Sequence, residues 1–198
     1  MRIEDGNGKG FVAKVNSQNR VLTFAESLPG GVIAATEKKL FTVATDLLEF
    51  TDDTESAIFY VRYTGANKLI MPRVAFTIEE STGAAGDSVV FMGYQNPTEG
   101  TIISDASAAT IRNRNFSGTA GQFPGVGYQG GQGKTMTDGD TFARPVFAAG
   151  SELNILELES EPICLEGGNS IGYTVTPPAG NTSISIRMLL YFYELTLE

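Results

Sequence analysis

Hydrophobic and polar residues alternate with a period of two through most of the chain, which is the pattern of β-strands with one buried face. We predict strands over residues 57–63, 68–79, 88–94, 153–158, 170–176 and 183–198. The last of them would carry on one face Ile184, Ile186, Met188, Leu190 and Phe192. Pro72 cannot donate a ladder hydrogen bond, so we expect a strand on each side of it and an edge position or a bulge there.

About eight strands separated by turn signals predict an all-β fold, an antiparallel β-sandwich or jelly roll. We place this domain over residues 35–198, after an extended N-terminal arm of residues 1–34. Helical signals are weak, with one or two turns over residues 104–112 capped by Ser104 or Asp105. A stretch with seven glycines, residues 117–133, predicts a surface loop that either orders against a partner or stays disordered in solvent. Its contact residues would be Phe123 and Tyr128.

The arm combines a glycine-spaced turn at residues 5–10 with two short extended segments at residues 11–15 and 21–25. Acidic residues and glycines stand where a signal peptide needs an apolar run of about 7–15 residues. Glycine and β-branched residues oppose a helix here, so we expect an ordered, extended arm that needs a neighbour to satisfy its backbone groups. The residues expected to contact that neighbour are Phe11, Val12, Val15, Arg20, Val21, Leu22 and Phe24.

Composition excludes several classes of function. The net charge of -9 argues against general nucleic-acid binding and against an anionic membrane surface as partner. The chain has no histidine, which excludes Ser-His-Asp and Cys-His catalytic sites and histidine-ligated zinc. Its one cysteine, Cys164, lies in an apolar run, and we expect a buried, inert thiol. No run approaches the ~20 apolar residues of a membrane span.

Several motifs resemble those of nucleotide-, phosphate- or calcium-binding sites but lack residues or flanking elements that such sites need. Residues 125–130 spell G-x-G-x-x-G, but neither a preceding strand nor a following helix is predicted. Residues 133–135 copy the end of a phosphate loop without its first glycine, and residues 5–10 resemble a calcium loop with Lys9 at a ligand position. Carboxylates gather over residues 46–55 and 152–161, and we interpret them as parts of solvated strand faces and loops. We therefore predict no catalytic residue, cofactor or metal.

The arm resembles a pattern found near the N-terminus of small virion proteins of tailed bacteriophages. Its elements are Asp5-Gly6-Asn7-Gly8-Lys9-Gly10, then Phe11-Val12-Ala13-Lys14-Val15-Asn16, then Asn19-Arg20-Val21-Leu22. The chain is most similar to head decoration, or cement, proteins, and the match covers its first quarter at most. The resemblance implies a homotrimeric β-sandwich that sits on the capsid surface, contacts the major capsid protein and bridges capsomers, after assembly in the host cytoplasm.

Two other functions remain open on the sequence. One is a tail, neck or fibre-associated β-module that binds a host receptor or a carbohydrate, which exposed aromatic residues at a concave site would favour. The other is a hydrolase with paired carboxylates, which a cleft holding two carboxyl groups ~5–10 Å apart would favour. The chain has no tryptophan to stack on a sugar ring. We expect a binding protein and no enzyme.

Overall fold

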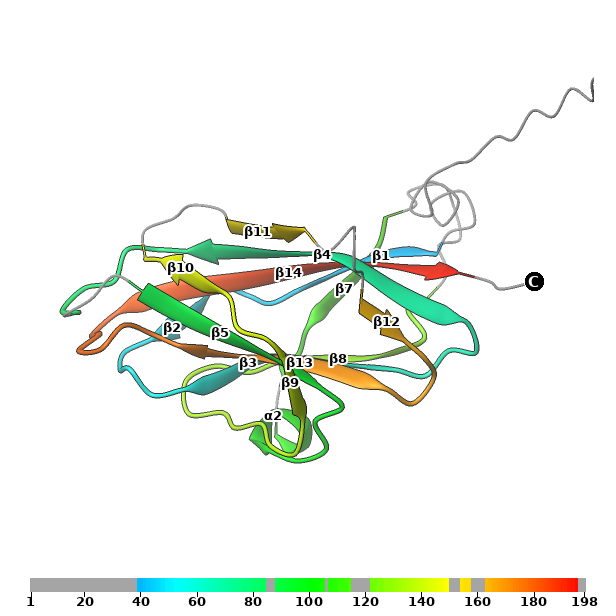
Figure 1. Ribbon diagram of the computed structural model, residues 1–198, viewed down its shortest axis with the longest axis horizontal. Coiled ribbons are helices and arrows are strands. Elements are labelled where there is room, and N and C mark those ends of the chain that lie inside the picture. The colour runs from blue at the N-terminus through cyan, green and yellow to red at the C-terminus, as the bar shows by residue number, and fades with distance from the viewer. Residues whose placement is uncertain are drawn as a thin grey trace, which may run out of the picture.

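The computed structural model describes residues 39–84, 88–105, 107–114, 122–149 and 163–195, together with the backbone of residues 154–157. Two seven-stranded sheets lie face to face (Figure 1), and the strand pairings among the described residues are antiparallel. The β14 sheet consists of β11 (Asn154–Glu157), β12 (Ile163–Leu165), β4 (Lys68–Ile78), β14 (Ile184–Leu195), β2 (Leu48–Phe50), β1 (Leu40–Ala44) and β7 (Thr110–Asn113). The β13 sheet consists of β9 (Asp140–Ala143), β10 (Val146–Ala148), β5 (Ser88–Gln95), β13 (Ser170–Thr176), β3 (Ser56–Tyr63), β8 (Gly125–Gln129) and β6 (Ser107–Ala108).

The order of pairing is that of a jelly roll. The first strands, β1 and β2, pair with the last, β14, and β3 pairs with β13. Further in, β4 pairs with β11 and β12, and β5 pairs with β9 and β10. The first strands thus pair with the last, and the strands between them pair in the same order towards the middle of the chain. This is the pairing of a long hairpin rolled into two sheets, and it confirms the predicted all-β sandwich.

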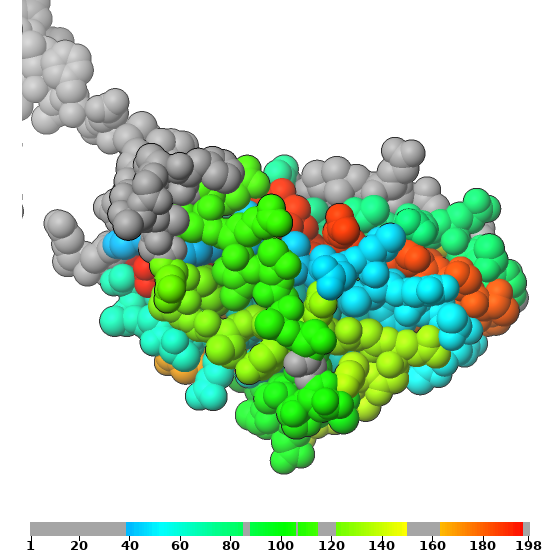
Figure 2. Space-filling view, turned by 180° about the vertical axis from the view of Figure 1, so that it is seen from behind, coloured from blue at the N-terminus to red at the C-terminus, as the bar shows by residue number. Residues whose placement is uncertain are grey.

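An insertion between β5 and β9 widens both sheets at the same edge. It contains the short helix α2 (Thr101–Ser104), β6, β7 and β8. Strand β7 extends the β14 sheet beside β1, and β8 extends the β13 sheet beside β3. In Figure 2, the green residues of this insertion form a band that runs from α2, at the bottom of the view, up to the β14 sheet. The insertion therefore joins the two sheets along one side of the sandwich.

Two local predictions in this insertion are wrong. The helical turn lies at Thr101–Ser104 rather than over residues 104–112, where β6 and most of β7 form instead. Residues 125–129 form strand β8 rather than part of a surface loop. A Cβ at position 130 would stand 1.9 Å from the backbone oxygen of Ala57, and one at position 125 would stand 2.2 Å from that of Arg62. These two glycines therefore let the chain run close against β3.

The core lies between the sheets and follows the period-two pattern. The predicted face of β14 is confirmed, because its five residues from Ile184 to Phe192 are each at most 1% exposed. At one end of the core, the Phe76 ring packs on the rings of Phe91 and Phe147, with centroids 4.2 and 5.2 Å away. Each buried side chain of this size contributes about 1.5–3 kcal/mol to folding.

Two tyrosines are fully buried in this core but differ in what their hydroxyl groups contact. The Tyr63 hydroxyl donates a hydrogen bond to Oε1 of Glu194, a residue only 8% exposed. The Tyr173 hydroxyl has no hydrogen-bond partner among the described residues. Burial raises the pKa of both phenols, and the Glu194 carboxyl raises that of Tyr63 further. Neither phenol ionises in the folded protein at neutral pH.

Pro72 lies inside one continuous strand rather than between two. On one side of β4, β12 pairs with residues 69–71 and β11 with residues 73–76, so the pairing skips the proline. On the other side, the register with β14 shifts between Tyr191 and Tyr193. The predicted bulge is therefore confirmed, and β4 keeps its direction past a residue that cannot donate to the ladder.

Candidate functional site

A groove crosses the outer face of the β14 sheet. Its floor is one row of neighbouring residues, in which Ala44 pairs with Thr110 on one side and with Leu189 on the other, and Leu189 pairs with Ala75. These four residues line a cavity of about 530 Å³. Two of them are alanines between longer side chains in the adjoining rows, which accounts for the hollow. Four strands about 4.8 Å apart give the floor a length of about 14 Å.

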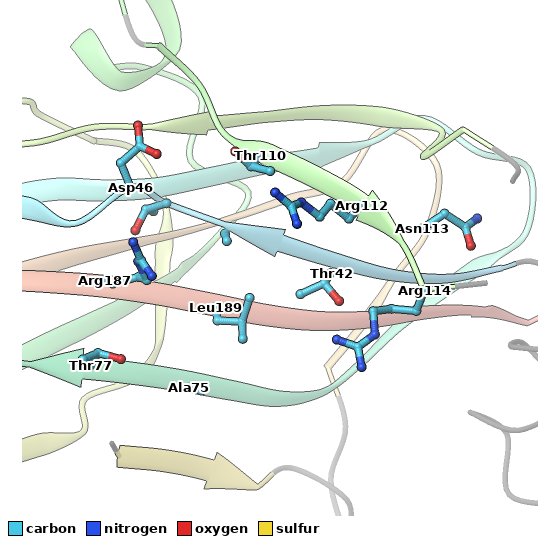
Figure 3. Close-up of a pocket in the computed structure, with 12 residues that line it drawn as sticks. Thr42, Asp46, Ala75, Thr77, Thr110, Arg112, Asn113, Arg114, Arg187 and Leu189 are labelled. Atoms are coloured by element: carbon cyan, nitrogen blue, oxygen red, sulfur yellow. The ribbon is translucent and has the colours of Figure 1, made fainter. Parts of the chain in front are cut away.

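Arginines stand on both sides of this floor (Figure 3). Arg112 belongs to the row beside it, where it pairs across β7 and β1 with Thr42. Arg187 belongs to the row on the opposite side, where it pairs across β14 and β4 with Thr77. Arg114 follows β7, and its backbone N–H donates to the oxygen of Leu40. The groove thus concentrates positive charge on a chain whose net charge is -9.

The three guanidinium groups have no partner within the described ranges: none takes part in an ion pair or a hydrogen bond there. One carboxylate, Asp46, also lines the groove, but it is already engaged by Gln129. The Gln129 side chain donates to Oδ2 of Asp46 over 2.7 Å and accepts from the Asp46 N–H over 2.6 Å. No described side chain therefore neutralises these three arginines.

Thr42 adds an unsatisfied polar group to the same groove. Its side chain lines the cavity on the side of Arg112 and is 7% exposed. Its Oγ1 has no hydrogen-bond partner among the described residues. A buried hydroxyl without a partner costs about 1–3 kcal/mol, so an occupant that accepts its hydrogen bond recovers that cost. Arginines and hydroxyl together suit a ligand with carboxylate or phosphate oxygens.

Of the contact residues predicted from the sequence, the structure describes Phe123 and Tyr128, and neither lines the groove. Those of the arm, from Phe11 to Phe24, fall outside the described residues. The Phe123 ring packs edge-on against Phe41 of its own core, with centroids 5.4 Å apart. The Tyr128 ring, on β8, stacks on Tyr60 with centroids 6.0 Å apart. The contact of Phe123 and Tyr128 with a partner stays a prediction, and both already have neighbours within the chain.

Cys164 is exposed, so the expectation of a buried thiol is wrong. It stands at the outward position of β12, between the half-buried Ile163 and the buried Leu165. The apolar run around it suggested burial, but the edge position of β12 leaves the outward side chain in solvent.

The carboxylates of residues 46–55 hold loops in place. The Asp52 carboxylate accepts hydrogen bonds from the N–H of Thr54 and the side chain of Gln132, and the Thr54 N–H above all lowers its pKa. Glu55 accepts from the hydroxyl groups of Thr174 and Tyr94. In the part of the chain that the structure describes, no group of three or more acidic or cysteine side chains is placed to hold a metal ion. No helix there is long and apolar enough to span a membrane.

Sequence reasoning missed the groove because its residues come from distant segments. Arg187 occupies an outward position of the alternating segment over residues 183–198, which is a signal that it is exposed, but no such segment was predicted around Arg112. Their meeting on one face depends on β7 pairing with β1, and residues 104–112 were expected to be helical.

Comparison with known proteins adds little. No protein family and no curated protein matches the sequence. Among solved structures, the crystal structure of tomato aspermy virus contains a chain that is 8% identical. The match covers 89% of this chain and 87% of that one, with a TM-score of 0.29. A TM-score this low is no basis for assigning a function.

Proposed function

We propose that this chain is a structural virion protein of a tailed bacteriophage, a cement protein that binds the outer surface of the capsid and stabilises the junctions between capsomers. The observation that carries the proposal is the arm sequence, from Asp5 to Leu22, which resembles the N-terminal pattern of such proteins. The arm precedes a jelly roll whose strands lie between Leu40 and Leu195. Fold alone does not specify function, so the proposal depends on the arm.

The apolar residues of the arm and the net charge of the chain are consistent with attachment to a capsid through many weak contacts. The six apolar residues of the arm that are expected to contact a neighbour would each contribute about 1.5–3 kcal/mol when buried there, before the cost of ordering the arm. A homotrimer on a lattice multiplies modest contacts through avidity. A net charge of -9 keeps such a protein from binding packaged nucleic acid. The protein would then act by binding, with no catalytic step.

Deletion of residues 1–26 from the full chain tests the proposal. We expect the truncated protein to keep the melting temperature of the full chain and to lose its attachment to phage particles, measured by co-sedimentation with heads. Electron microscopy of intact particles would place the full-length protein on the head surface. Unfolding of the truncated chain would assign the arm to the core. Unchanged binding, or density confined to tail or fibre, would refute the capsid role.

A further inference from the structure

We propose that the groove on the β14 sheet binds an extended, acidic segment of another protein. The segment would lie along the floor of Thr110, Ala44, Leu189 and Ala75, with its carboxylates paired to Arg112 and Arg187. This inference concerns the sandwich and does not rest on the function proposed for the arm.

The shape of the groove favours a polypeptide over a bare ion. A floor about 14 Å long accommodates about four residues of extended chain at about 3.3 Å each. The floor is uncharged, and Leu189 with two alanines offers apolar contact to small side chains between the acidic ones. Arg112 and Arg187 lie in the rows on opposite sides of the floor, so successive carboxylates of one segment can meet both.

The charges favour carboxylates. A guanidinium group forms two parallel hydrogen bonds to one carboxylate, and such bonds are about twice as strong as neutral ones. A nucleic acid also presents oxygen anions, but it would meet a chain with a net charge of -9. A peptide with two or three acidic residues brings less charge and can bury it in this groove.

Thr42 supplies the second contact. Its Oγ1, unpartnered among the described residues, lies in the row of Arg112 next to the floor, where it can donate to a carbonyl or carboxylate oxygen of the segment. Removing this hydroxyl should weaken binding without weakening the fold, because the free protein gains nothing from it.

The test uses fluorescence anisotropy with the full chain and a fluorescein-labelled hexapeptide, Ala-Glu-Ala-Ala-Glu-Ala, whose two glutamates point to opposite sides of an extended chain. The R112Q/R187Q variant should bind at least about tenfold more weakly, equivalent to about 1.4 kcal/mol. The matched control is R62Q/R144Q, which removes an exposed arginine on β3 and another directly after β9 and gives the same charge change. It should bind within about twofold of the wild type, because charges outside the groove are screened by salt. Thr42→Val should bind more weakly with an unchanged or higher melting temperature.

Four results would overturn the proposal. One is no binding of the acidic hexapeptide at about 1 mM, a concentration corresponding to only about -4.1 kcal/mol. Another is an equal loss of binding in the R62Q/R144Q control. A third is competition by inorganic phosphate or a thymidine oligonucleotide that exceeds competition by the unlabelled peptide. The fourth is self-association that R112Q/R187Q abolishes while the peptide does not bind, which would assign the groove to a second copy of the chain.

Discussion

Removing the hydroxyl of Tyr173 should stabilise the protein. The side chain is fully buried, and its hydroxyl has no partner among the described residues. Burying an unsatisfied hydroxyl costs about 1–3 kcal/mol, whereas the single oxygen atom contributes few packing contacts, so Tyr173→Phe should gain about 1 kcal/mol. For a chain of 198 residues, that gain raises the melting temperature by about 2–4 °C.

The matched control is Tyr63→Phe, which removes the same atom from another fully buried tyrosine. Here the hydroxyl satisfies the Glu194 carboxyl, and its loss leaves that buried group without the donor. We expect a destabilisation of about 1–3 kcal/mol. The chain has no tryptophan, so urea unfolding is best followed by far-ultraviolet circular dichroism. A loss of more than about 1 kcal/mol in Tyr173→Phe would mean that its hydroxyl has a partner, and the reasoning would fail.

Three further outcomes are expected. Stability should fall as the pH rises above 10.0, because the pKa values of Tyr63 and Tyr173 are raised in the folded state and the unfolded chain loses these protons first. The free energy of unfolding should fall by about 1.4 kcal/mol per pH unit for each of the two tyrosines. In Tyr173→Phe, urea unfolding at several pH values should show a slope smaller by the contribution of one tyrosine, and a slope equal to that of the wild type would contradict this prediction. Gly130→Ala should destabilise the protein by about 1–3 kcal/mol or more, because its Cβ would stand 1.9 Å from a backbone oxygen of β3. Gly127→Ala, whose Cβ would have its nearest contact at 3.3 Å, should destabilise it by less than about 1.5 kcal/mol. Equal changes in melting temperature for the two variants would contradict this. The Cys164 thiol should react with a disulfide reagent in the native protein, and a reaction seen only in denaturant would show that it is shielded.

The sequence predicted the fold well where burial alone decides it. Residues 184–192 alternate so regularly that the inner face of β14 follows directly, and Pro72 indicated the bulge in β4. It failed where a residue type has more than one use. The glycines at 125 and 130 are typical of loops, yet they serve a close approach to β3 that only the paired structure reveals.

The groove was beyond sequence reasoning for a different reason. The rows of a sheet join residues that are far apart in the chain, such as Arg112 and Thr42 or Arg187 and Thr77. Period-two patterning tells which residues face outward, but it does not tell which strands are neighbours. That information depends on the pairing of the whole sandwich, including the β7 strand of the insertion.

The central place of β14 has a consequence for how the protein is made. This last strand hydrogen-bonds to β1, β2 and β4, so half of the sandwich cannot close before it exists. At roughly 5–20 residues per second, a ribosome completes β1 roughly 7–30 s before it reaches β14. Through that interval the nascent chain exposes unpaired strands, and contacts between such distant segments form slowly. The β14 sheet can therefore complete its pairing only after this strand has left the ribosome.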